Sequence, residues 1–511
     1  MAATAGSRMN ILAAIDDPNL FGPWFKDRAT WAAWRSFLCA LFALPMSDAE
    51  ASVYRACTGR AALPTAAFTE GWLVCGRRAG KSFMLALTAV YLAAFKDYSK
   101  YLAPGERGTV LVISADRKQS RVVLRYIGAL LKGVAMLSRL IERETAEAFD
   151  LTNRTTIEVG TASYRTTRGY TFVAILLDEM AFWRSEDSAS PDYEVLAAVR
   201  PGMSTIPNAV MLCASSPYAR RGALHDAFQK YYGKDSPVLV WKAPTLTMNP
   251  TVPQSVIDEA MERDPASASA EYLAEFRTDI ESFIGVEAVR ACIASGMRER
   301  PPGRQHRYFG FVDPSGGSSD SFTLAIAHKS GDTSILDLLR EVKPPFSPEA
   351  IAEEFADVLK SYRITKVTGD AYGGEWPREQ FRKFGINYEV SDQTRSEIYL
   401  GLLPLINSRA VDLIDNDRLV NQLISLERRT ARSGKDSIDH PSGSHDDVCN
   451  AAAGALCRAW KVAPEWRRDR STQVPMTANL GGRELFTVRP RKSNGDGVVG
   501  DSSRRSASQS V

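Results

Sequence analysis

The sequence predicts two α/β domains, the first built on a mainly parallel sheet and the second on a mixed sheet. Short apolar runs alternate with helical patterns as far as about residue 270, which is typical of βαβ units. A second unit starts near residue 306 with three apolar runs joined by short connections rich in Gly, Ser and Asp, which indicates an antiparallel meander. The length of 511 residues also exceeds what one core usually holds.

These patterns divide the chain into four segments. We expect a first domain over residues 1–270, a charged and mostly helical linker over 271–304, a second domain over 305–463 and a flexible basic tail over 464–511. The expected strands cover 71–75, 109–114, 156–159, 172–177, 210–214 and 238–241 in the first domain, and 308–312, 322–327, 334–338 and 364–369 in the second.

Composition excludes several classes of protein. The 63 basic and 60 acidic residues nearly balance, so any DNA contact must come from a local basic surface and not from a polycationic chain. The seven cysteines form no C-x-x-C pair, which argues against a disulfide framework or a structural zinc site and favours a reducing, cytoplasmic setting. No apolar run has the length of a membrane span, so we expect no membrane partner.

The first motif is a loop between the apolar run 71–75 and a helix-prone run, 83–95. Such a loop cradles phosphates with its backbone N–H groups, while its lysine reaches the β and γ oxygens and its hydroxyl binds Mg²⁺. Cys75 stands where the strict motif has its first glycine, and two arginines fill the interior. Either this is a chance basic loop, or it is a variant phosphate loop in which one arginine touches the nucleotide. The loop consists of Gly76, Arg77, Arg78, Ala79, Gly80, Lys81 and Ser82.

A pair of acids, Asp178 and Glu179, ends the apolar run 173–177, which has the composition of a buried parallel strand. Ligands bind at the carboxyl ends of the strands in open α/β sheets. In an ATPase the aspartate holds the Mg²⁺, and the glutamate orients and deprotonates the attacking water. In isolation the pair equally fits two acids at a helix N-terminus. Together with the loop, it predicts binding and hydrolysis of ATP.

Two further segments of the first domain are candidates for contact with the nucleotide. Ser215 and Ser216 follow the apolar run 210–214 and form either a turn that senses the γ-phosphate or an ordinary turn at the end of a strand. The aromatic-rich segment 21–41 either walls the adenine or forms the core of a helix.

Aspartates stand at the ends of several elements expected in the second domain. Three acids from distant parts of one α/β unit can form a cluster that binds two Mg²⁺ or Mn²⁺ ions about 3.5–4 Å apart for phosphodiester cleavage. The alternative is that these aspartates serve ordinary turns and helix caps. The candidates are Asp313, Asp320 and Asp370, each near a strand end, and Asp446 and Asp447, which follow His445 at the start of an Ala-rich helix.

Together these motifs resemble those of the large terminase subunit of tailed bacteriophages, over about residues 60–460. The arginine-bearing phosphate loop is characteristic of that family. The resemblance implies an ASCE-type P-loop ATPase with a mainly parallel sheet, followed by an RNase H-like nuclease with a mixed sheet. It places the nucleotide on the loop, its Mg²⁺ on Ser82 and Asp178, catalysis on Glu179 with Arg77 or Arg78, and coupling on Ser215 and Ser216.

In the nuclease, the resemblance matches Asp313, Asp370 and Asp447 to the catalytic, metal-binding triad and Asp320 to an accessory acid. Asp447 is preferred to Asp446 because His-x-Asp is the commoner spacing in the family. The segment 21–41 departs from the family, since it lacks the glutamine that many relatives carry near the adenine.

The resemblance implies a viral packaging motor in the cytoplasm of the bacterial host. Its cofactors are ATP and Mg²⁺, or Mn²⁺ in the nuclease. Its partners are double-stranded DNA, the portal protein and the small terminase subunit, with a homo-oligomeric ring on the portal and a monomer in solution as an option. Two alternatives stay open: a P-loop helicase-nuclease of DNA repair or defence, and an inactive, prophage-derived DNA-binding scaffold.

Overall fold

The computed structural model describes residues 9–162, 169–183, 188, 190–317, 320–370, 375–430, 436–441 and 444–461. The tail expected over 464–511 lies outside these residues. None of the helices in the described ranges is long and apolar enough to cross a membrane.

The first domain is built on an eight-stranded sheet in the order β3-β4-β5-β2-β6-β7-β1-β8. The strands from β5 to β8 in this order are parallel to one another, and a hairpin of two antiparallel strands extends one edge. The strand that precedes the phosphate loop and the strand that ends in the acidic pair are separated by one other strand. The bounds are β1 Glu70–Cys75, β2 Gly108–Ser114, β3 Ile141–Glu144, β4 Ala148–Leu151, β5 Thr155–Thr161, β6 Thr171–Asp178, β7 Val210–Ser215 and β8 Val238–Ala243.

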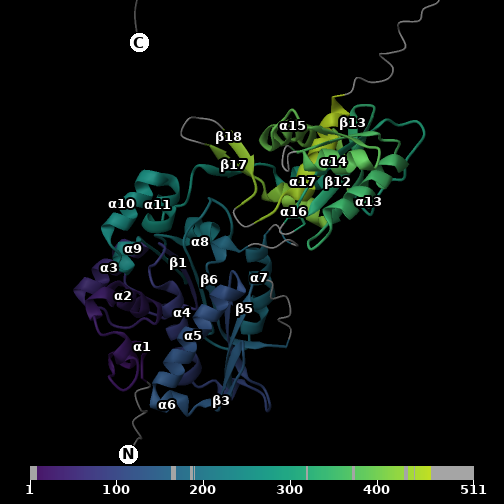
Figure 1. Cartoon of the computed structure of the whole chain (residues 1–511). Coiled ribbons are helices and arrows are strands. Elements are labelled where there is room, and N and C mark those ends of the chain that lie inside the picture. The colour runs from purple at the N-terminus through teal and green to yellow at the C-terminus, as the bar shows by residue number, and fades with distance from the viewer. Residues whose placement is uncertain are drawn as a thin grey trace, which may run out of the picture. The chain divides into compact units, whose positions relative to one another are not determined.

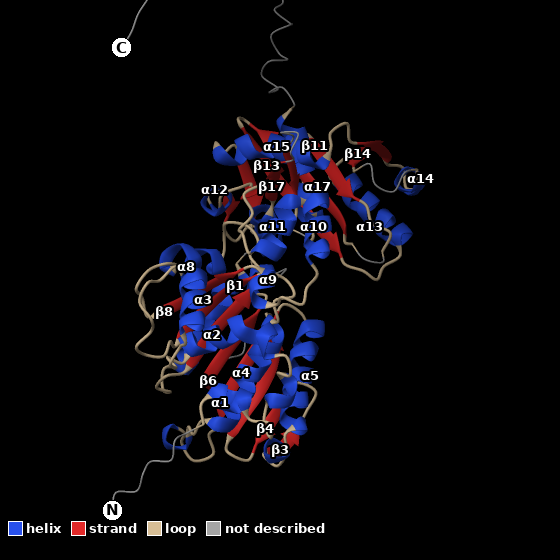
Figure 2. Cartoon of the chain, turned by 90° about the vertical axis from the view of Figure 1, so that its left-hand side faces the viewer, coloured by secondary structure: helices blue, strands red, loops and turns tan. Residues whose placement is uncertain are grey.

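Helices cover both faces of this sheet. Alternate residues of the central strands enter two separate apolar clusters, one shared with α2, α4 and α5 and the other with α7 and α8. Figure 2 shows α4 and α5 lying over the strands of the sheet. The α-helices are α1 Ile11–Asp16, α2 Ala32–Leu41, α3 Asp48–Thr58, α4 Lys81–Phe95, α5 Arg117–Gly133, α6 Ala135–Ser138, α7 Pro191–Val199, α8 Ala223–Tyr231, α9 Thr245–Met248, α10 Gln254–Arg263 and α11 Pro265–Leu273. Short 3-10 helices are η1 Gly22–Trp24, η2 Arg28–Trp31, η3 Ser99–Tyr101, η4 Met180–Phe182 and η5 Arg200–Met203.

The second domain has a seven-stranded sheet in the order β10-β16-β13-β12-β11-β14-β15 and a small sheet in the order β18-β17-β9. Strands β11, β12 and β13 form the predicted antiparallel meander, whereas β14 and β15 continue the sheet in parallel. The bounds are β9 Ile280–Ser282, β10 Ile293–Ala294, β11 Tyr308–Asp313, β12 Phe322–Ser330, β13 Thr333–Val342, β14 Lys366–Gly369, β15 Asn387–Val390, β16 Val411–Ile414, β17 Glu427–Thr430 and β18 Asp436–Asp439. The predicted α/β class, with a mainly parallel sheet followed by a mixed one, is confirmed.

Helices also cover both faces of the seven-stranded sheet (Figure 1). Residues of α12, α15, α16 and α17 pack with Phe311 on one face, and residues of α13 and α14 pack with Val312 on the other. The segment 271–304 contributes to both domains: Ala274 lies in a core of the first, while Ile284 lies in a core of the second. The helices are α12 Val286–Arg290, α13 Pro348–Ser361, α14 Trp376–Lys383, α15 Arg395–Asn407, α16 Asp417–Ser425 and α17 Asp447–Trp460.

Candidate functional site

The phosphate loop, residues 76–82, joins the end of β1 to the start of α4. Gly80 caps α4 with a φ of 94°, in the left-handed region that glycine adopts without strain. Gly76 has no room for a side chain, because a Cβ there would lie 2.2 Å from Thr245 Oγ1 and 2.8 Å from the carbonyl oxygen of Tyr272. The loop is therefore a tight turn that leads into a 15-residue helix, and the N–H groups at the start of such a helix attract phosphate.

Lys81 brings three predicted segments together. Its buried Nζ donates to the carbonyl oxygens of Cys75 at 3.2 Å and Gly76 at 3.1 Å. The same Nζ donates to Ser216 Oγ at 2.9 Å and lies 3.0 Å from Glu179 Oε1. The phosphate loop, the acidic pair and the serine turn therefore meet at one ammonium group.

Asp178 is fully buried at the end of β6 and accepts a hydrogen bond at 2.8 Å from the Ser82 hydroxyl through Oδ2. Burial raises the pKa of Asp178 to about 7; the charge of Glu179 adds to the rise, while Ser82 and Lys81 oppose it. Its Oδ1 is buried and has no hydrogen-bond partner among the described residues. A buried, unpartnered carboxylate oxygen beside a hydroxyl fits the oxygen ligands that Mg²⁺ prefers.

Glu179 adopts a left-handed backbone conformation, with a φ of 52° that is uncommon for a residue with a side chain. This conformation turns its carboxylate toward the serine turn. Oε2 accepts hydrogen bonds from the backbone N–H of Ser216 at 3.0 Å and from the Ser215 hydroxyl at 3.2 Å. The predicted general base is therefore held by the predicted coupling residues on one side and by Lys81 on the other.

The two arginines of the loop are both exposed but have different surroundings. Nη1 of Arg77 lies 3.1 Å from Glu271 Oε2, and this partner raises the pKa of Arg77. Arg78 has a φ of 64°, and its carbonyl oxygen accepts a hydrogen bond from Asn249. Within the described part of the chain, the guanidinium of Arg78 has no hydrogen bond or ion pair.

The aromatic-rich segment 21–41 forms the core behind the loop. Trp34 and Phe37 lie in α2 and are buried. Trp34 Nε1 donates to the carbonyl oxygen of Ala79 at 2.8 Å, which fixes the loop against α2. Of the two predicted alternatives, the structure shows the helix core.

The predicted acids of the second domain lie at the ends of three elements. Asp313 ends β11, Asp370 follows β14 and Asp447 begins α17. Because β11 and β14 are parallel neighbours, Asp313 and Asp370 lie at the same edge of the sheet. Thr323, opposite Asp313 on β12, donates its hydroxyl to the carbonyl oxygen of Asp447 at 2.8 Å. The start of α17 is thus tied to that edge.

Asp313 is buried and accepts a hydrogen bond from Asn450 Nδ2 at 2.7 Å. Burial raises the pKa of Asp313 to about 8; the charges of Asp447 and Asp370 add to the rise, while Asn450 and Arg395 oppose it. Asn450 Oδ1 is itself buried without a hydrogen-bond partner among the described residues. These oxygen donors fit Mg²⁺ or Mn²⁺, whose positive charge would favour the ionised form of Asp313.

The structure distinguishes the neighbours Asp446 and Asp447. Asp446 is buried; its Oδ1 lies 2.8 Å from Arg395 Nη1, and its Oδ2 accepts a hydrogen bond from the Tyr399 hydroxyl at 2.8 Å. Asp447 is half-buried and accepts a hydrogen bond at 3.1 Å from the backbone N–H of Ser321. Both oxygens of Asp446 therefore have partners within the protein.

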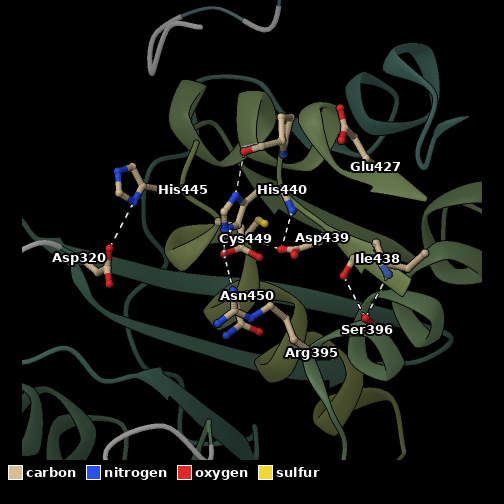
Figure 3. Close-up of polar contacts among 12 residues, drawn as sticks. Asp320, Arg395, Ser396, Glu427, Ile438, Asp439, His440, His445, Cys449 and Asn450 are labelled. Atoms are coloured by element: carbon tan, nitrogen blue, oxygen red, sulfur yellow. Dashed lines mark hydrogen bonds and ion pairs between the residues drawn. The ribbon is translucent and has the colours of Figure 1, made fainter. Parts of the chain in front are cut away.

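Asp320, the predicted accessory acid, lies 3.5 Å from His445 Nδ1 (Figure 3). In the ranges that the structure covers, no three His, Cys, Asp or Glu side chains form a set placed to hold a metal ion. Three residues that surround the acids were not predicted from the sequence: Arg395, Tyr399 and Asn450. Asn450 had a signal, because it lies three residues beyond Asp447 on an expected helix and so on the same face.

Comparison by sequence finds no protein-family model and no curated protein that matches this chain. Comparison by structure finds bacteriophage large terminases. The HK97 bacteriophage large terminase matches with a TM-score of 0.35 at 14% identity, over 76% of this chain and 91% of that chain. The large terminase of another, thermophilic bacteriophage matches with a TM-score of 0.36 at 10% identity, over 81% of this chain and 98% of that chain. The large terminase nuclease of thermophilic phage G20c with bound magnesium matches with a TM-score of 0.31 at 15% identity, over 34% and 98%. These three solved structures are two large terminases and the nuclease of a third.

Proposed function

We propose that the chain is a DNA-packaging motor subunit that hydrolyses ATP to move double-stranded DNA into a procapsid and cuts concatemeric DNA with a metal-dependent endonuclease. One observation carries the proposal: Lys81, Ser216 and Glu179 meet at the carboxyl edge of a parallel sheet. In the second domain, Asp313 and Asp370 lie at the same edge of the sheet, which supports a metal-dependent nuclease.

When ATP binds, the Lys81 ammonium leaves the Glu179 carboxylate and contacts the β- and γ-phosphate oxygens of the nucleotide instead. Ser82 and Asp178 would hold Mg²⁺, which neutralises charge on the phosphates. Glu179, released by Lys81, then takes a proton from the attacking water. Because Ser215 and Ser216 both donate to the Glu179 carboxylate, they change partners when Glu179 moves and so link hydrolysis to β7.

In the nuclease, Asp313, Asp370 and Asp447 would hold Mg²⁺ or Mn²⁺, which activates water and stabilises the leaving oxygen. The positive charge of a bound cation would favour the ionised form of Asp313. The partners that this function requires are double-stranded DNA, a portal protein and a small terminase subunit. A ring of subunits on the portal would act in the cytoplasm of the bacterial host.

The proposal is tested with the purified full chain and Mg²⁺ or Mn²⁺. ATP turnover, plasmid cleavage and DNase-protected DNA inside procapsids that carry the portal are measured with and without ATP. We expect all three, with ATP turnover stimulated by DNA and portal. Strand separation of a duplex without portal or procapsid would favour a helicase-nuclease instead, and no turnover of either kind would leave only a DNA-binding scaffold.

A further inference from the structure

One arginine lies among the acids of the nuclease site. Arg395 is the first residue of α15, whose start is fixed by a capping box in which Thr394 and Glu397 exchange hydrogen bonds. Its Nη1 lies 2.8 Å from Asp446 Oδ1, and its Nη2 lies 3.5 Å from Asp370 Oδ2. The guanidinium thus bridges Asp370, a predicted metal ligand, and Asp446, which is adjacent in sequence to the predicted ligand Asp447.

The two contacts of Arg395 differ in strength. Asp446 is buried and held from its other side by the Tyr399 hydroxyl, so the short ion pair to Asp446 anchors the arginine. The contact to Asp370 is at the limit of hydrogen-bond length and can be exchanged for a better acceptor. A guanidinium offers five donors in a planar fork and stays charged, which suits a phosphate oxygen.

Arg395 also meets an electrostatic need of the site. The charges of Asp447 and Asp370 add to the rise in the pKa of Asp313, and the positive charge of Arg395 opposes that rise. The Nη2 contact places part of this positive charge beside Asp370, where a second divalent cation would otherwise neutralise the carboxylate. An arginine that covers the Asp370 side leaves the remaining negative charge for a single ion.

We propose that Arg395 takes the place of one of the two expected divalent cations, so that the nuclease site holds one Mg²⁺ or Mn²⁺ per chain and Arg395 binds the scissile phosphate. This inference rests on the proposed nuclease function. In the reaction, a water oxygen bonds to phosphorus, the P–O3′ bond breaks and a proton of that water passes to the leaving O3′. Arg395 stabilises the negative charge on the phosphate as this happens.

The test is a count of bound Mn²⁺ by electron paramagnetic resonance on the full chain, repeated with a cleavage-resistant phosphorothioate duplex. The number of ions in the nuclease site is the count for a given protein minus the count for the same protein with Asp313→Ala added. Ions bound at the ATP site contribute equally to both counts and drop out of the difference. We expect one such ion in the parent protein and two in Arg395→Gln, with cleavage about 100-fold slower. Arg395→Lys keeps the charge but loses the fork, so we expect one ion and slower cleavage.

Arg300→Gln is the matched control, because Arg300 makes a 3.0 Å ion pair with Asp412 and donates to Leu336 at the other end of the sheet. It should keep one ion and the parent rate. Three outcomes would each contradict the inference without contradicting the proposed nuclease function. They are two Asp313-dependent ions in the parent, one such ion in a folded Arg395→Gln variant, and cleavage at the parent rate in Arg395→Lys. If Arg395→Gln fails to fold, the ion count of the parent and the cleavage rate of Arg395→Lys still test the inference. No Asp313-dependent ion and no cleavage would instead overturn the nuclease itself.

Discussion

At the residue scale, the phosphate loop offers two arginines, and their surroundings favour Arg78 as the one that acts on the nucleotide. Arg77 is tied to Glu271, whereas the guanidinium of Arg78 has no such partner within the described ranges. We expect Arg78→Ala to lower the kcat of ATP hydrolysis by about 100-fold or more, the typical loss of one electrostatic group in a transition state. The measurement is steady-state phosphate release.

Arg77→Ala is the control for this prediction. It removes an ion pair of an arginine side chain that is 62% exposed, and such pairs contribute little. We expect a kcat within about threefold of the parent and little change in stability. A larger loss in Arg77→Ala than in Arg78→Ala would reverse the assignment.

Asp313 predicts a pH dependence of stability in the metal-free protein. Its pKa rises from the ordinary 3.8 to about 8 through burial, so the folded protein binds this proton more tightly than the unfolded chain does. The stabilisation is therefore fully present below about pH 4 and is lost as the pH rises towards 8. Asp313→Asn cannot ionise, so at pH 9 we expect it to exceed the parent by a few kcal/mol in the free energy of unfolding. Urea unfolding with EDTA checks this; a gap that is equal at pH 4 and pH 9 would contradict it.

At the element scale, the central strands were predictable because each is an apolar run that is buried on both faces. The run 172–177 became β6, for example, in which every residue is buried. The hairpin of β3 and β4 at one edge of the sheet escaped prediction, because the edge strand β3 reads Ile-Glu-Arg-Glu and is mostly exposed. The order of the strands, with β7 between β1 and β6, depends on contacts between distant segments and leaves no local pattern.

The packing of α17 on β11 gives a prediction about Gly454. A Cβ at this position would lie 2.3–2.6 Å from the ring atoms of Phe311, which is buried in the sheet. We expect Gly454→Ala to push α17 away from the strand and lower the free energy of unfolding by about 1–3 kcal/mol, as overpacked cores do. Thermal unfolding followed by circular dichroism measures the shift.

Gly401 in α15 is the matched control, since it is also a helical glycine of the second domain. A Cβ there meets only Cys457 Sγ at 3.5 Å, an ordinary contact. Alanine favours a helix over glycine by about 0.5–1 kcal/mol, so we expect Gly401→Ala to leave the melting temperature unchanged or to raise it. If both variants melt at the same temperature, α17 does not depend on the close approach.

At the scale of the whole molecule, the sequence predicted both candidate sites from a local pattern, because most of their acids follow apolar runs that form strands. It could not find Arg395, which reads as an ordinary residue at the start of a helix and reaches the acids only through the fold. The residues alone also could not separate Asp446 from Asp447, and the preference for Asp447 came from the spacing that is commoner in the family it resembles. The structure gives the two residues different surroundings, because Asp446 pairs with Arg395 on α15.

Two sites on different sheets predict that each activity can be removed alone. Glu179→Ala removes the proposed general base, so we expect ATP hydrolysis to fall by about 100-fold or more while plasmid cleavage with Mn²⁺ stays within about threefold. Asp313→Ala should do the reverse, because its carboxylate lies at the edge of the second sheet. Both activities are measured on the same preparation of each variant, and the melting temperature confirms the fold. A folded variant that loses both would show that the two sites depend on each other, because neither carboxylate belongs to the other site.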